Sequence, residues 1–167
     1  MRWDRLFADL EAEVSEIQKA ETEGLAADLR DEIWAGTSWR DLVGGHVLLE
    51  VRGAGQIAGE MAAVNEHLVR VRGTLVDHLV AGRSVTSVLK TERRADPPSR
   101  IDAALGWSRA LRRLRDGGEP VRVVLEDSRA VHGAIEVVGA DFVRLVAGDA
   151  APRLVTLSAI SVVTSGR

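Results

Sequence analysis

The chain has 167 residues, a formal net charge of −3 and no cysteine. The lack of cysteine excludes a disulfide framework, a cysteine-ligated metal site and a cysteine nucleophile. No apolar run reaches the length of a membrane span, and charged residues interrupt the first ten positions, so we expect a cytoplasmic protein without a signal peptide.

Residues 1–36 are predicted to form an acidic helical leader. They hold ten acidic and four basic residues, a local charge of −6, and the rest of the chain is therefore +3. The apolar residues keep heptad spacing and then resume displaced, which predicts a bend or break near Thr22–Gly24. We consider two partners for this stripe, the protein's own strands or a second chain in a coiled coil. Its members are Trp3, Phe7, Leu10, Val14 and Ile17, then Leu25, Leu29 and Ile33.

A single helical turn is predicted after the leader. Ser38 followed three residues later by Asp41 resembles a capping box, and the turn contains Trp39. Gly44-Gly45 ends the turn before the first strand.

Five short β-strands are predicted between Val121 and Val163. Apolar residues alternate there with polar or small ones, β-branched residues are frequent, and turn-type residues separate the runs. Five short, strongly bent strands can close around a few inward side chains. The pattern favours a small barrel of the Sm-like or SH3-like kind.

The same pattern occurs earlier in the chain, which indicates a tandem repeat. An offset of 74 residues carries Gly59 to Gly133 and Val69 to Val143. After one extra residue in the loop of residues 148–152, an offset of 75 carries Leu79 to Leu154. One nearly constant offset with matched glycines is economically explained by two copies of one fold.

The predicted fold class is therefore mainly β, with an N-terminal α-helix and two tandem five-stranded barrels, each preceded by a helix. The expected divisions are the leader at 1–36, the first barrel at 37–91, a linker at 92–100, and a helix with the second barrel at 101–167. The second helix is predicted between an N-cap at Ser99 and the pair Gly117-Gly118, with a stripe of Ile101, Leu105, Leu111 and Leu114.

The two barrels are expected to join through their edge strands, because unpaired backbone groups at an edge favour pairing with another strand. Two arrangements would satisfy one edge of each barrel inside the chain. Either Leu79-Val80 pairs with residues 160–163, or residues 85–88 pair with Leu154-Val155.

The last part of the chain resembles the Sm-like (Hfq-like) family of small β-barrels over roughly 45 residues. The resemblance lies in the segments Val121–Asp127, His132–Glu136, Asp141–Leu145, Leu154-Val155 and Ala159–Val163. It implies a ring-forming, RNA-binding ancestry. Where that family has a lysine and a histidine lining its RNA-binding pore, this chain has Leu157 and Ser158. The whole chain, with its acidic leader and its excess of arginine over lysine, also resembles uncharacterised proteins of high-GC Gram-positive bacteria.

No constellation typical of catalysis stands out. The four histidines are scattered and have no metal-ligand spacing, so we predict neither a metal site nor a cofactor. The run Gly53-Ala54-Gly55 lacks the lysine and following helix of a phosphate loop and is interpreted as a hairpin turn. We therefore expect a binding protein and no enzyme.

Arginines supply the candidate binding residues. On the second helix they occur at i, i+3 and i+4, opposite the apolar stripe, and such a face can follow a phosphate backbone. The resulting hypothesis is an RNA-associated module; the alternative is a protein-interaction or assembly scaffold that uses the N-terminal helix or the barrel edge strands. The candidate RNA-binding residues are Arg83, Arg109, Arg112, Arg113 and Arg144.

Overall fold

The computed structural model describes the backbone of residues 2–92 and 106–166, and the side chains within these ranges except those of residues 2–14, 17 and 90–92. The fold is mainly β, with a long N-terminal helix and one ten-stranded antiparallel sheet. The chain divides into two compact units, residues 1–41 and 42–167, and the sheet belongs to the second.

Helix α1 (Arg2–Gly36) is continuous, so the predicted break near Thr22–Gly24 is wrong. The Thr22 hydroxyl donates to the main-chain oxygen of Gln18 at 2.8 Å, which keeps this β-branched residue within the helix. Gly24 has open space around it and lowers helix propensity without changing the backbone path. The side chains of the first five stripe residues, from Trp3 to Ile17, are not among those described. The other three, Leu25, Leu29 and Ile33, are each more than half exposed.

Two shorter helices lead into the strands. The main-chain N–H of Ser38 donates to Oδ2 of Asp41 at 3.1 Å, as the capping box predicts, and opens α2 (Trp39–Leu42). Helix α4 (Trp107–Gly117) ends at Gly118, which has a φ of 73° and donates its N–H to the Arg115 oxygen. The predicted cap at Ser99 lies outside the described residues, as do Ile101, Leu105 and all of the predicted 92–100 linker except Glu92, which ends the fifth strand. Gly106 is extended, so α4 begins at Trp107 and the predicted helix does not run unbroken from Ser99.

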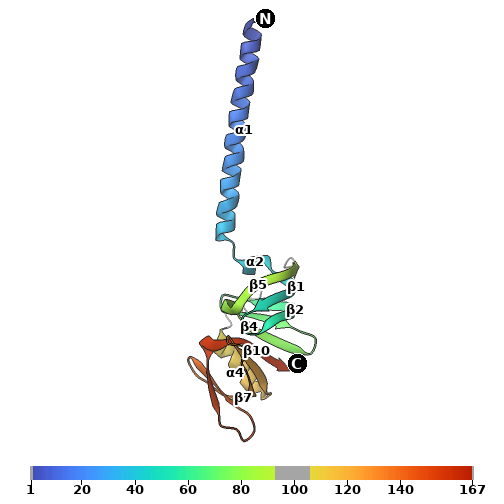
Figure 1. Cartoon of the computed structure of the whole chain (residues 1–167), viewed down its shortest axis with the longest axis vertical. Coiled ribbons are helices and arrows are strands. Elements are labelled where there is room, and N and C mark those ends of the chain that lie inside the picture. Colours follow the sequence, from blue (N-terminus) through green and yellow to red (C-terminus); the bar gives the residue numbers. More distant parts are fainter. Residues whose placement is uncertain (1, 93–105, 167) are drawn as a thin grey trace. The chain divides into compact units, whose positions relative to one another are not determined.

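Each half of the sheet has five strands, with one turn of 3-10 helix before the fifth. In Figure 1, β5 lies beside β1, and β4 lies beside β10. The first half comprises β1 (Gly44–Val51), β2 (Gly55–Val64), β3 (Leu68–Arg72), β4 (Val76–Ala81), η1 (Gly82–Ser84) and β5 (Val85–Glu92). The second half comprises β6 (Val121–Leu125), β7 (Ala130–Val138), β8 (Phe142–Val146), β9 (Arg153–Thr156), η2 (Leu157–Ala159) and β10 (Ile160–Gly166).

Strand pairing confirms the repeat at the level of single residues. The ladder between the second and third strands shifts register at equivalent places, residues 61–63 and 135–137. A Cβ on Gly59 or Gly133 would press on a main-chain oxygen of the facing third strand, so both glycines permit the same close approach. Among the equivalent pairs are Val47–Gly59 with Val121–Gly133, and Val69–Val80 with Val143–Val155.

The ten strands form one open sheet, so the prediction of two separate barrels is not met. Strand order is β5-β1-β2-β3-β4-β10-β6-β7-β8-β9. The halves are continuous because β4 and β10 pair antiparallel, with Val80 opposite Val162 and Leu79 opposite Val163. This is the first of the two predicted junctions. Each strand supplies backbone donors and acceptors that would otherwise be an open edge.

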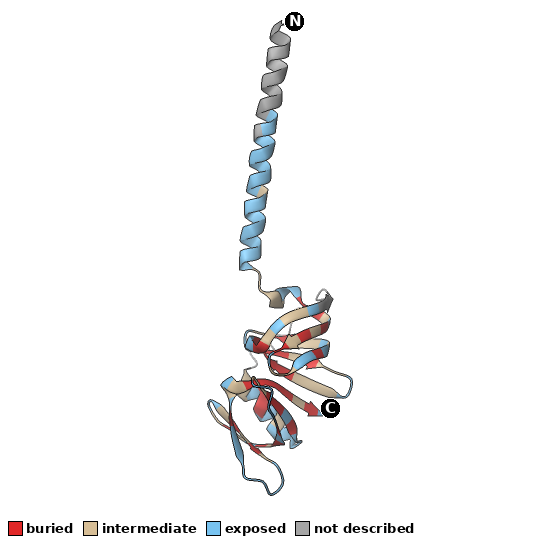
Figure 2. Cartoon of the chain, in the orientation of Figure 1, coloured by how far each residue is buried: buried red, intermediate tan, exposed pale blue. Residues whose placement is uncertain are grey.

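The apolar core extends across the β4–β10 junction. Leu68 and Leu79 of the first half belong to the same buried cluster as Ile160 and Val163 of the second. Helix α4 covers the second half with Ala110 and Leu111, which are 3% and 0% exposed. Buried residues are concentrated on the strands (Figure 2). The halves are therefore held together by backbone pairing and by shared side-chain packing.

Candidate functional site

The junction between the two halves carries the most specific polar contacts in the sheet. The Arg83 guanidinium, at η1 beside β4, donates through Nη2 to the main-chain oxygens of Leu157, Ser158 and Ile160. Its distances to the Leu157 and Ile160 oxygens are 3.1 and 2.9 Å. Its Nε lies 3.5 Å from Oε1 of Glu126. Arg83 thus joins the turn before β5 to the equivalent turn before β10.

A second contact at the junction depends on glycine. Gly53 lies in the hairpin between β1 and β2 with a φ of 77°, and a Cβ at this position would collide with the main-chain oxygen of Leu125. Nη1 of Arg52, the residue before Gly53, lies 3.9 Å from Oε1 of Glu126. The predicted hairpin turn is therefore present, and it also packs against the other half of the sheet.

His78 adds a side-chain hydrogen bond between β4 and β10. Its Nδ1 lies 3.0 Å from Oγ1 of Thr164, the residue opposite it in the ladder. Burial lowers the pKa of His78 below its ordinary value, and the adjacent Asp77 carboxylate opposes part of this effect. The neutral imidazole is thus the form that the junction favours.

The structure separates the five candidate arginines into two groups. Arg83 is engaged at the junction, and Arg144 on β8 forms an ion pair with Glu136 on the adjoining β7, 2.7 Å from Nε to Oε2. Both guanidinium groups already have partners within the fold. Neither lies on α4 with the other candidates, so the five residues do not form one surface.

Arg109, Arg112 and Arg113 do form one exposed face of α4. They lie opposite the buried Ala110 and Leu111. Within residues 2–92 and 106–166, no acidic side chain forms an ion pair with any of the three. Three unneutralised charges on consecutive turns make this face suited to an anionic partner.

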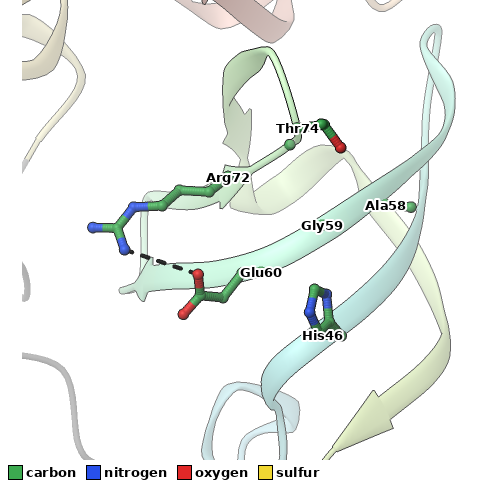
Figure 3. A pocket seen from close by; sticks show the side chains of 7 residues that line it. His46, Ala58, Gly59, Glu60, Arg72 and Thr74 are labelled. Carbon is green, nitrogen blue, oxygen red and sulfur yellow. Dashed lines mark ion pairs between the residues drawn. The ribbon is translucent and has the colours of Figure 1, made fainter. Parts of the chain in front are cut away.

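A cleft of about 410 Å³ lies over β1, β2 and β3 (Figure 3). His46, Glu60 and Arg72 are successive partners across these three strands. The Arg72 guanidinium is 4.0 Å from the Glu60 carboxylate, the pair that the dashed line marks in Figure 3. The Glu60–Arg72 pair is typical of cross-strand stabilisation. Its charges balance one another and select no particular ligand.

The two outer strands are the open edges of the sheet. In the part of the chain that the structure describes, β5 pairs only with β1 and β9 only with β8. Leu154 on β9 is 64% exposed, whereas its repeat equivalent Leu79 on β4 is 8% exposed because β10 covers it. A second cleft, of about 440 Å³, lies beside β9 and includes Leu154 in its wall. Leu154 is more exposed than Leu79 because no strand among the described residues covers it.

Sequence reasoning missed Gly53, His78 and Glu126 as junction residues. The repeat offset contained a usable signal, since Gly53 corresponds to Asp127, Arg83 to Ser158, and Arg52 to Glu126. Residues that differ in chemistry between two copies of one fold point to places where the copies have different neighbours.

Comparison of the sequence with protein-family models and with curated proteins gives no match. In the described residues, no group of three or more His, Asp or Glu side chains could hold a metal ion. None of the described helices combines the length and apolar character needed to cross a membrane.

The first prediction concerns Arg83. Arg83→Met keeps most of the side-chain volume and removes every donor, leaving the Ile160 oxygen without this part-buried partner. We expect a loss of about 1–3 kcal/mol in the free energy of unfolding, measured by urea denaturation. Arg113→Met, an equal change on the exposed face of α4, is the control and should be nearly neutral. Equal stability of both variants would contradict the role of Arg83.

The second prediction follows from His78. Because its pKa is lower in the folded than in the unfolded protein, the unfolded chain takes up a proton first as the pH falls. This contribution to stability should be complete above a pH of roughly 6.5 and should decline below it, towards the lowered folded pKa. Urea midpoints at several pH values should fall less steeply in His78→Gln than in the wild type. Parallel pH profiles for the two proteins would exclude this role of His78.

Proposed function

We propose that the protein is a non-catalytic assembly module made of two Sm-like units fused in one chain, whose copies associate through their open sheet edges. Several features support the Sm-like assignment: a helix that leads through glycine into five strands, the strand order 5-1-2-3-4 in each half, and a short turn before the fifth strand. They agree with the resemblance of residues 121–163 to that family.

The assembly proposal rests on which strands form the two open edges of the sheet. Inside the chain, the fourth strand of the first half pairs with the fifth strand of the second. Among residues 2–92 and 106–166, the strands that pair on one side alone are β5, a fifth strand, and β9, a fourth strand. The two outer edges of the sheet are therefore a fifth strand and a fourth strand, the same two kinds of strand that pair at its centre.

Transferring the internal register to two chains gives a definite arrangement. The pair Val80–Val162 becomes Val155 opposite Ser87 of the neighbouring chain, and Leu79–Val163 becomes Leu154 opposite Val88. Leu154 would then lose the exposure that distinguishes it from Leu79. Such head-to-tail contacts use two different surfaces, so they either close into a ring or continue as a filament.

The proposal predicts that Leu154→Lys weakens self-association. A lysine at the edge removes an apolar cross-strand pair and places a charge where the neighbouring strand would lie. The wild-type mass should rise with concentration in sedimentation velocity, and the variant should need about ten times more protein for the same rise. Leu75→Lys, an equal change at a leucine that is 77% exposed in the turn between β3 and β4, is the control.

Two results would contradict the edge-to-edge proposal. One is a wild type that stays a single chain at all concentrations. The other is association that Leu154→Lys leaves unchanged, which would instead favour the exposed stripe of Leu25, Leu29 and Ile33 on α1 as the contact.

RNA binding is the second candidate function, and the exposed face of Arg109, Arg112 and Arg113 favours it. These arginines have no acidic partner among the described residues, so their charge is available for phosphates. Arg83 and Arg144 no longer contribute to this candidate, because each is engaged within the fold.

The RNA candidate predicts a specific salt dependence. Replacing Arg109, Arg112 and Arg113 by glutamine should keep α4 folded and weaken binding to a single-stranded RNA. The slope of log affinity against log salt should fall by about 2, since each phosphate contact contributes about 0.7. Arg115→Gln with Arg129→Gln serves as a control, because Arg115 pairs with Asp116 and Arg129 pairs with Asp127. An unchanged slope, or no RNA binding by the wild type at low salt, would remove this candidate.

A further inference from the structure

We infer that Asp127 makes the junction between chains looser than the junction within the chain, and so sets the concentration at which copies assemble. This inference depends on the proposed edge-to-edge assembly. It follows from comparing the residues of the internal junction with those that stand in their places at the outer edges.

The comparison is possible because the two hairpins correspond. In the first, the N–H of Arg52 donates to the Ser84 oxygen at 2.8 Å; in the second, the N–H of Glu126 donates to the Ala159 oxygen at 3.0 Å. Both hairpins close with one turn, residues 51–54 and 125–128, at N–O distances of 3.1 and 3.0 Å. The position of Gly53 in the first hairpin is therefore that of Asp127 in the second.

Gly53 contributes two properties of glycine to the internal junction. It has no Cβ, so the main-chain oxygen of Leu125 can lie against its Cα, and it adopts a positive φ of 77°. At an outer junction the corresponding oxygen is that of Val51 in the neighbouring chain. Asp127 would place a Cβ against this oxygen, while its carboxylate accepts hydrogen bonds from the main-chain N–H and the guanidinium of Arg129. Its own hairpin places the positive φ at Ser128 instead. The hairpin cannot approach as closely as Gly53 does.

The outer junction also lacks the Arg83 contacts. The residue in the place of Arg83 is Ser158, whose side chain is too short to reach three main-chain oxygens. The strands β9 and β5 can still pair, and Leu154 can still be covered, while the hairpins stay apart. Association between chains is thus weaker than the union of the two halves and responds to concentration.

One arginine–glutamate ion pair would be present at both junctions. Arg52 faces Glu126 within the chain, and Glu126 stands in the place of Arg52 on the outer side. Glu126 of one chain would therefore face Arg52 of the next, so arginine and glutamate would alternate through the assembly. The outer hairpin would keep this ion pair, so the steric obstacle to its approach is the side chain at position 127.

The test compares Asp127→Gly with Asp127→Ala in the full-length protein by sedimentation velocity over a range of concentrations. Glycine removes the side chain and permits a positive φ, whereas alanine removes only the carboxylate and keeps the Cβ. We expect Asp127→Gly to lower the dissociation constant for self-association at least about tenfold, as relief of a steric conflict would. Asp127→Ala should stay within about threefold of the wild type.

Adding Leu154→Lys to Asp127→Gly should reverse the gain, which assigns it to the β9 edge. The inference fails if the wild type associates and Asp127→Gly associates no more tightly, or if alanine strengthens association as much as glycine. The proposed assembly itself fails, together with the inference, if the wild type and Asp127→Gly both remain single chains at the highest concentration.

Discussion

The backbone pairing of β4 with β10 is the interaction on which the rest of the sheet depends. Each half presents two edges, and an edge of unpaired N–H and C=O groups favours addition of another strand. Joining β4 to β10 removes two of the four edges and creates one continuous sheet. It also brings Leu68 and Leu79 into the buried cluster of the second half. Backbone pairing and apolar burial therefore stabilise the same boundary.

The two copies of the repeat have different residues at equivalent positions of this boundary. Gly59 and Gly133 are equivalent and serve the same close approach within each half. Gly53 and Asp127 are equivalent in position but differ in chemistry, because only Gly53 meets the other half. The internal junction has thus acquired contacts that the outer edges lack.

The candidate arginines differ in whether they have an acidic partner within the fold. Arg83 and Arg144 have acidic partners within the fold, Glu126 in the hairpin after β6 and Glu136 on β7. Arg109, Arg112 and Arg113 have no such partners among the described residues. Electrostatic attraction of a polyanion depends on charge that is exposed and unpaired, so among the five candidate arginines only Arg109, Arg112 and Arg113 keep charge that a polyanion could meet.

The sequence by itself determined the local elements of this protein. Alternation of apolar and polar residues located the ten strands, the 74-residue offset identified their repeat, and Ser38 with Asp41 predicted the start of α2. These features are governed by neighbouring residues. The break near Thr22–Gly24 was wrong because its local propensities were too weak to interrupt a long helix.

Only the tertiary structure decided which edges meet and which side chains remain available. The sequence allowed two junctions, and it could not distinguish Arg83 from Arg113, since both are arginines in polar surroundings. The choice depends on residues about 75 positions apart whose backbone groups and side chains become neighbours only in the folded sheet. Hydrophobic alternation encodes which face of a strand is buried, whereas the identity of the strand beside it follows from long-range packing.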